Sequence, residues 1–383
     1  MTLRTFRPAL IFLSVVLALS CSKPPLRYDL TQSEFDWPLA GFNAARSFHT
    51  AADLTPPLHE RKRFKLTSAV EQNIIVAGGL LFAPTKDGQL HVIDLATLTI
   101  KRRLKMPRKY ATTVAAIPDG LVLAQRFGQE TLIRHQLVTG KPVWKVEAGD
   151  IAGEPLVDGQ VVYVAALYAH VDCYDLSDGH LIWQFRAEGQ IHTSLALADG
   201  ILVFATDRGH VYGLHTESGK EIWRVELGEA VLASPAIHAA RVFVGTNDKR
   251  VVALDLYTGD FVWRQEIAGR VFNAPAVNDE MVVFPASDSR LHAFSPDKGE
   301  LLWESEALSV IGTSPLLTGA HVFFGSLDQH LYCIDARDGE LRWRQELPGR
   351  VRTNPIIWKD YLIVGSEDRY LHIFAQPDSS AAN

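Results

Sequence analysis

The sequence predicts an all-β protein, an eight-bladed β-propeller of four-stranded blades. The first observation is a phrase of two short apolar strands joined by a glycine-ended turn, clearest in Val251 to Trp263, VVALDLYTGDFVW. The second is that this phrase recurs, with its tryptophan at Trp144, Trp183, Trp223, Trp263, Trp303 and Trp343. A step of 39 or 40 residues between these tryptophans, in strand-and-turn sequence, is typical of a propeller.

The length of the repeating region gives the number of blades. Residues 44–375 make 332 residues, which is about eight units of 40. The last unit ends at Ala375 without a fourth strand, whereas an unpaired strand, His59 to Leu66, precedes the first unit. We therefore expect this N-terminal strand to complete the eighth blade, with Phe64 about where a tryptophan would stand. Such closure removes the free sheet edges of an open array.

Each unit can be divided into strands and turns from its residues. After the tryptophan strand comes a polar or small residue and usually a proline, as in Ser234-Pro235. Proline lacks an amide donor and tolerates only strand ends and edges, so it marks the crossing to the next blade. Apolar strands follow, joined by a turn with a recurring acid such as Asp288, which we expect to bond the local backbone. In the first unit Arg102 or Arg103 replaces the tryptophan.

The first 21 residues predict an export signal. Arg4 and Arg7 precede a short apolar run, and Ser20 places a small residue directly before Cys21. The run is too short to span a membrane as a helix. It resembles a bacterial lipoprotein signal, which implies a signal peptide over 1–20, acylation of Cys21 and, because Ser22 follows, location at the outer membrane facing the periplasm. The alternative is an ordinary cleaved signal with an incidental cysteine.

The remaining segments follow from this division. We expect a flexible tether over 21–43, the propeller over 44–375 and a disordered tail over 376–383. Cys173 and Cys333 occupy equivalent positions four repeats apart, on opposite sides of an eight-unit ring. Because a disulfide needs close Cα atoms, we expect two free, buried thiols.

Composition and motifs exclude several functions. The formal charge is -6 with both signs scattered, which does not suggest nucleic-acid binding. The chain has no H-E-x-x-H, C-x-x-C, P-loop or G-x-S-x-G motif. His91, His292 and His372 recur at one repeat position, as strand-face residues do. We therefore expect no catalytic residue, no metal and no cofactor.

The segments between tryptophan and proline differ most among the units, and in a propeller they lie near the mouth of the central channel. Arginine and aromatic residues are favoured at hot spots of protein interfaces. The alternative is that these arginines form a solvated rim. The candidate partner-binding residues are His192, Arg270, Phe272, Asn273, Arg350 and Arg352.

The in-phase glycine and tryptophan pairs resemble the tryptophan-docking, PQQ-like repeats of quinoprotein-type propellers. The resemblance implies that the six tryptophans pack between neighbouring blades. With the lipoprotein signal, the architecture resembles the family of the outer membrane protein assembly factor BamB. That implies a monomeric, non-catalytic periplasmic scaffold, held to the membrane by its lipid alone, whose partner is the β-barrel assembly machinery.

Two alternatives stay open. One is an envelope lipoprotein of the same repeat class that binds another protein or a polysaccharide. The other is a quinone-binding oxidoreductase, although the adjacent cysteines that such dehydrogenases carry are missing from this sequence. The enlarged crossover loop of the assembly-factor family is also missing, because all crossovers here are short.

Overall fold

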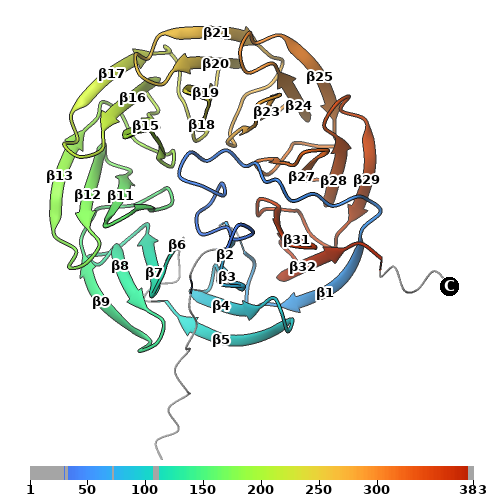
Figure 1. Ribbon diagram of the computed structural model, residues 1–383, viewed down its shortest axis with the longest axis horizontal. Helices are drawn as coiled ribbons and strands as arrows, with labels where there is room; N and C mark the ends of the chain where they lie inside the picture. Colours follow the sequence, from blue (N-terminus) through green and yellow to red (C-terminus); the bar gives the residue numbers. More distant parts are fainter. Residues whose placement is uncertain (1–29, 31–32, 71–72, 107–111, 378–383) are drawn as a thin grey trace, which may run out of the picture.

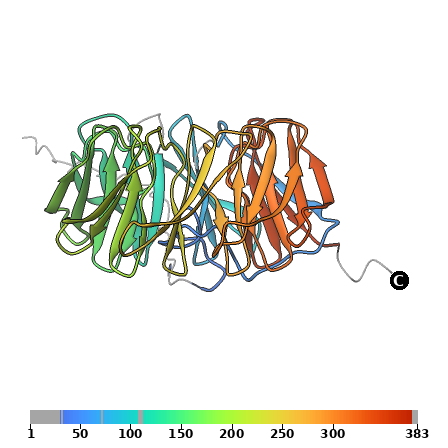
Figure 2. The same cartoon turned by 90° about the horizontal axis from the view of Figure 1, so that it is seen from above.

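The computed structural model describes residues 30, 33–70, 73–106 and 112–377. These residues form eight four-stranded antiparallel sheets arranged as a ring (Figure 1). Seen from the side the ring is a low disc, with the strands running between its two faces (Figure 2). The predicted eight-bladed β-propeller is therefore confirmed. The described residues include no helix long and apolar enough to cross a bilayer.

Each blade has four strands, counted from the channel outward. The innermost are β2 (Ile75–Ala77), β6 (Thr112–Ile117), β10 (Leu156–Asp158), β14 (Ala196–Ala198), β18 (Ala236–His238), β22 (Ala276–Val277), β26 (Leu316–Leu317) and β30 (Ile356–Trp358). The second are β3 (Leu80–Thr85), β7 (Gly120–Gln125), β11 (Val161–Ala166), β15 (Ile201–Ala205), β19 (Arg241–Gly245), β23 (Val282–Pro285), β27 (His321–Gly325) and β31 (Tyr361–Gly365). The third are β4 (Gln89–Asp94), β8 (Leu132–Gln136), β12 (His170–Asp175), β16 (His210–His215), β20 (Arg250–Asp255), β24 (Arg290–Phe294), β28 (His330–Asp335) and β32 (Tyr370–Ala375). The outermost are β5 (Thr99–Lys105), β9 (Lys141–Val146), β13 (Leu181–Arg186), β17 (Glu221–Glu226), β21 (Phe261–Glu266), β25 (Leu301–Glu306), β29 (Leu341–Glu346) and β1 (His59–Lys65).

Burial follows the position of a strand in its blade. The second and third strands are almost wholly buried, as in β15 and β20, because neighbouring blades cover both faces of each sheet. Such strands read as continuous apolar runs. In an outermost strand such as β21 most side chains are exposed, and the fully buried one is its tryptophan, Trp263.

The repeated tryptophans pack across the junctions between blades. Trp263 of the fifth blade donates its indole N–H to the carbonyl of Pro296 in the sixth blade, at 2.8 Å. Its ring lies against Gly299, where a Cβ atom would come within 2.6 Å of the indole. Trp144, Trp183, Trp223 and Trp303 donate to the equivalent carbonyls of their next blades. Trp343 packs edge-on against Phe374 of β32 instead.

Replacing Trp263 by alanine is expected to lower the free energy of unfolding by about 3–5 kcal/mol, since it empties a buried junction. The matched control is Val262→Ala on the same strand, whose side chain is 38% exposed and should cost less than about 1 kcal/mol. Urea unfolding of both variants measures the difference. Similar losses in the two variants would show that the indole does not join the blades.

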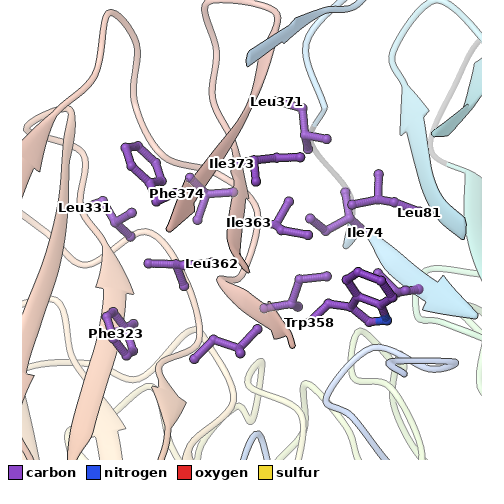
Figure 3. Close-up of a cluster of buried hydrophobic side chains, with 14 of the residues drawn as sticks. Ile74, Leu81, Phe323, Leu331, Trp358, Leu362, Ile363, Leu371, Ile373 and Phe374 are labelled. Atoms are coloured by element: carbon purple, nitrogen blue, oxygen red, sulfur yellow. The ribbon is translucent and has the colours of Figure 1, made fainter. Parts of the chain in front are cut away.

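The ring closes as the sequence predicts, because β1 pairs antiparallel with β32 and completes the eighth blade. The register corrects one detail. Lys62, opposite Ile373 beside the bulge, occupies the tryptophan position, and Phe64 lies two residues further along, opposite Leu371. Phe64 is nevertheless buried, in a core cluster that joins the seventh, eighth and first blades. Figure 3 shows this cluster, with side chains from β27, β28, β30 to β32 and the start of the first blade.

The two thiols in the ring are buried and unbonded, as predicted. Burial raises the pKa of Cys173 to about 12, with the carboxylates of Asp175 and Asp172 adding to the shift. Burial likewise raises the pKa of Cys333 far above its ordinary value. Both side chains therefore remain protonated at neutral pH and pack as small apolar groups.

Candidate functional site: the central channel and its mouth

The N-terminal segment differs from the flexible tether expected up to residue 43. Residues 33–58 cross the centre of the ring before β1 begins (Figure 1). Trp37 is buried, and it exchanges two backbone hydrogen bonds with Val76 of β2, at 2.8 and 2.9 Å. Its indole N–H also reaches the carbonyl of Ile357 in β30, at 2.7 Å. We call residues 36–50 the plug, because they cross the channel at one face of the ring.

The plug bonds to the innermost strands one after another. The acceptors are carbonyls of the plug, and the donors are amides at the same position of the second blade and of the fourth to seventh blades. The pairs are Pro38 with Ala116, Ala44 with Leu197, Ala45 with Ile237, Ser47 with Val277 and Phe48 with Leu317, all at 2.8 or 2.9 Å. An innermost strand would otherwise present an unpaired edge to the channel. The plug therefore satisfies edges that the ring alone leaves open.

Arg46 of the plug turns its side chain into the channel wall. The guanidinium forms an ion pair with Glu154 at 3.1 Å, with side chains only 3% and 12% exposed. It also donates to the carbonyls of Leu195 and Ala40, at 2.5 and 2.9 Å. Burial by itself would raise the pKa of Glu154, but Arg46 and hydrogen bonds from Ser194 and Asn73 hold that pKa below its ordinary value. Glu154 is therefore a buried carboxylate at neutral pH.

Glu154 belongs to a polar girdle around the channel, formed by Asn73, Glu154, Ser194, Ser234, Ser314 and Asn354. Five of these, all except Asn73, stand two residues before the first strand of a blade, at positions that are multiples of 40 apart. The Ser194 hydroxyl and the Asn73 amide donate to the two oxygens of Glu154. Asn354 donates to Asn73 at 2.6 Å, and Ser314 and Ser194 donate backbone amides to Asn354 and Ser234. The girdle members thus serve as one another's partners.

The girdle residues line a polar chamber of about 190 Å³ in the channel. Arg46 and Phe48 of the plug contribute to its lining, and so do three of the six residues predicted as candidates: His192, Phe272 and Asn273. Phe272 is 45% exposed, although aromatic side chains usually favour the interior. Half of the candidate residues thus line one chamber.

The three candidate arginines lie in crossovers of the same face but outside the chamber lining. Arg350 and Arg352 share one carboxylate, that of Glu367, at 4.0 and 2.9 Å. Arg270 is exposed, and its backbone exchanges hydrogen bonds with Ser287 in the neighbouring turn. The rim therefore carries charges of both signs, with these arginines on the side of the sixth to eighth blades and acids such as Glu188 and Glu229 in other crossovers. The arginine side suits an acidic partner segment.

The plug and the girdle are what sequence reasoning missed. A signal for the plug was present: Phe35, Trp37, Leu39, Phe42 and Phe48 make the segment far too apolar for a solvated tether. The girdle had a weaker signal, in the polar residues that precede the prolines. Neither pattern predicts which residues meet across the channel.

His292 and the acids of one exposed turn could suggest a metal, but they have partners within their own blades. The buried ring of His292 lies between the carboxylates of Asp288 and Glu304, each at 2.9 Å. Asp175, Asp178 and His180 form a group with metal-ligand spacing in an exposed turn. Both acids accept local backbone amides there, as turn-forming aspartates do. The predicted lipidation site, Cys21, lies outside the described residues.

Comparison with known proteins identifies relatives of this ring. The model of a family described as outer membrane protein assembly factor BamB matches residues 128–219, 207–316 and 287–380. No curated protein matches the chain. Among solved structures, BamB from Moraxella catarrhalis superposes with a TM-score of 0.72 at 18% identity, over 83% of this chain and 100% of that one.

Two dehydrogenases share the fold as well. A quinohemoprotein alcohol dehydrogenase from Comamonas testosteroni has a TM-score of 0.77 at 14% identity, over 90% of this chain and 82% of its own. A europium-containing methanol dehydrogenase has a TM-score of 0.77 at 13% identity, over 91% and 99%. At these identities the structural likeness shows the propeller fold alone.

Proposed function

Because the chain belongs to the family described as outer membrane protein assembly factor BamB, we propose that it is a non-catalytic scaffold of the bacterial envelope that helps β-barrel proteins assemble into the outer membrane. It acts by docking a protein of the assembly machinery on the crossover face of the ring. Acylation of Cys21 holds it at the periplasmic side of the outer membrane, and the ring works as a monomer.

The observation that carries this proposal is the asymmetry of the two faces. The plug crosses the channel at one side and leaves a cavity of about 720 Å³ against the second and third blades. The crossover side has a smaller polar hollow with an exposed aromatic residue, Phe272, and arginines in neighbouring crossovers. The polar groups at the base of the hollow already bond to one another, which favours a surface for docking over a site that rearranges bonds. A rigid ring that displays short loops is well suited to this role.

The test is crosslinking in intact cells with the full-length protein, followed by purification and mass spectrometry. Barrel-assembly proteins should be recovered with the unmodified chain and lost when Arg350 and Arg352 are both changed to glutamate. The matched control reverses Lys220 and Lys298, two exposed lysines in turns of the opposite face, and should keep the partners. Recovery of an unrelated envelope complex, or equal loss in the control, would contradict the proposal.

The dehydrogenases of the same fold supply the competing function, a quinone enzyme. Protein purified from its native host distinguishes the two. A quinone absorbance band that persists through purification, together with dye-linked alcohol oxidation, would overturn the scaffold proposal. We expect neither, because the chamber measures only about 190 Å³ and its polar lining is engaged in the girdle.

The Cys21→Ala variant is expected to move the protein from the membrane fraction to the soluble periplasmic fraction. Each buried methylene of an acyl chain contributes about 0.8 kcal/mol to membrane binding, so loss of the chains removes the anchor. Cell fractionation with immunoblotting measures the change, and Ser22→Ala serves as the control. Retention of the Cys21→Ala variant in membranes would exclude the lipid anchor.

A further inference from the structure

The junction between the first and second blades lacks the indole that joins the blades from the second to the eighth. In β5 the residue beside the strand bulge, where other outermost strands carry tryptophan, is Arg102, opposite Val92 of β4. The glycine that would receive the indole is still present as Gly140, with the same left-handed backbone, φ 66°. A Cβ atom placed on Gly140 would lie 4.0 Å from the Arg102 guanidinium, whereas one on Gly179 would lie 2.8 Å from Trp144.

A cleft of about 190 Å³ occupies this junction. Leu121, Leu123 and His135 line it. By strand register they correspond to Val162, Val164 and Tyr174 of the third blade. Those three residues surround Trp144 at the junction between the second and third blades. Leu90, Leu104, Met106 and Ile133 complete an apolar wall. An apolar cavity of about 150 Å³ is sufficient to bind a benzene ring. The cleft therefore has both the lining and the size for an aromatic side chain.

The polar groups around the cleft add a second property. The strand beside it, β5, has the sequence TIKRRLK, with four cations and no acid. Lys105 and Lys145 both line the cleft; Lys145 pairs with exposed Glu130, and within the described residues Lys105 makes no ion pair. The Nδ1 atom of His135 is buried, and none of the residues that the structure describes forms a hydrogen bond with it. The surroundings favour a ligand with negative charge and a polar ring atom.

We propose that this inter-blade cleft binds an indole side chain presented by an acidic segment of a partner polypeptide. The partner's tryptophan takes the place that the chain's own tryptophans take at other junctions, and its flanking carboxylates meet Lys105 and Lys145, the two cations that line the cleft. The site lies at the outer part of the ring, away from the channel mouth, and it relies on the proposed scaffold role only for the kind of ligand, a polypeptide.

The experiment uses ¹⁹F NMR with the purified full chain and three probes. The first is a short peptide with 5-fluorotryptophan between pairs of glutamates, the second has lysines in place of the glutamates, and the third is free 5-fluoroindole. We expect the acidic peptide to bind at least tenfold more tightly than either of the others. Equal binding of free fluoroindole would overturn the assignment to a polypeptide, and no binding of the acidic peptide at millimolar concentration would overturn the site.

Three variants locate the binding. Arg102→Trp restores the repeat and fills the cleft, so it should weaken peptide binding at least tenfold and raise the melting temperature. Arg103→Trp is the matched control, since the adjacent residue points to the other side of the strand and should leave binding within twofold. Lys105→Glu changes only an exposed side chain, so we expect the variant to fold normally. It should also weaken binding of the acidic peptide tenfold. Unchanged binding in both Arg102→Trp and Lys105→Glu would refute the proposal.

Discussion

Replacing Arg46 by methionine is expected to lower the free energy of unfolding by about 3–5 kcal/mol, because it leaves the Glu154 carboxylate buried without its counter-ion. The variant also removes the donors to two carbonyls, that of Leu195 in the channel wall and that of Ala40 in the plug. Urea unfolding at pH 7 measures the loss. Since methionine retains most of the arginine's length, lost packing contributes little.

Two further variants isolate the charge effect. In the double variant Arg46→Met with Glu154→Gln, no charge remains buried, so part of the stability should return. Arg352→Met removes a partly exposed ion pair with Glu367, with side chains 37% and 32% exposed, and should cost at most about 1 kcal/mol. Equal losses for Arg46→Met and Arg352→Met would mean that the plug is not fastened through Glu154.

The same pair predicts a dependence on pH. The pKa of Glu154 is lower in the folded chain than in the unfolded one, so its contribution to stability is complete above the unfolded value, about 4.3. It is lost as the pH falls through the folded pKa. The unfolding free energy of the native chain should therefore drop more between pH 5 and pH 3 than that of Glu154→Gln. Parallel pH profiles for the two proteins would contradict the shift.

The second large effect concerns ring closure. Replacing residues 59–65 by seven glycines and serines keeps the plug connected but removes β1 from the eighth blade. Loss of buried Phe64 alone should cost about 3–5 kcal/mol, and β32 gains a free edge. We expect a lower melting temperature, a broader transition and concentration-dependent association, measured by calorimetry and light scattering.

The outermost strand of the first blade is the matched control for closure. β5 also has seven residues and lies at the outer edge of its sheet, so the same replacement there exposes β4 without opening the ring. It should cost less, and the protein should unfold in a sharper transition. If both replacements had the same effect on cooperativity, β1 would be an ordinary edge strand and not the closing one.

The sequence predicts the ring well because the information is local and repeated. Each unit carries its own turn glycine and its own strand pattern, and one copy such as Val251 to Trp263 can be checked against the others. The closing strand was predictable for the same reason, since the eighth unit lacked its fourth strand. The position of Phe64 was misjudged by two residues, because β1 carries Lys62 beside the bulge where other outermost strands carry tryptophan, so no aromatic residue marks the equivalent position.

The plug could not be predicted in this way, since it occurs once and its contacts are remote. The indole of Trp37 bonds a carbonyl 320 residues further along the chain, and no local pattern indicates that pairing. The candidate site shows the same limit. His192, Phe272 and Asn273 were predicted one by one from differences among repeats, but only the folded ring shows that they line one chamber whose base includes Arg46.

The plug also has a consequence for how the chain arrives at eight blades. Blades built from nearly identical units could in principle form rings of seven or nine, since each junction resembles the next. Trp37, Pro38, Arg46 and the residues from Ala44 to Phe48 together reach every blade at least once, by a hydrogen bond or an ion pair. In a ring with one blade more or fewer, these plug residues would not all meet their partner strands. The plug contacts therefore favour a ring of eight blades.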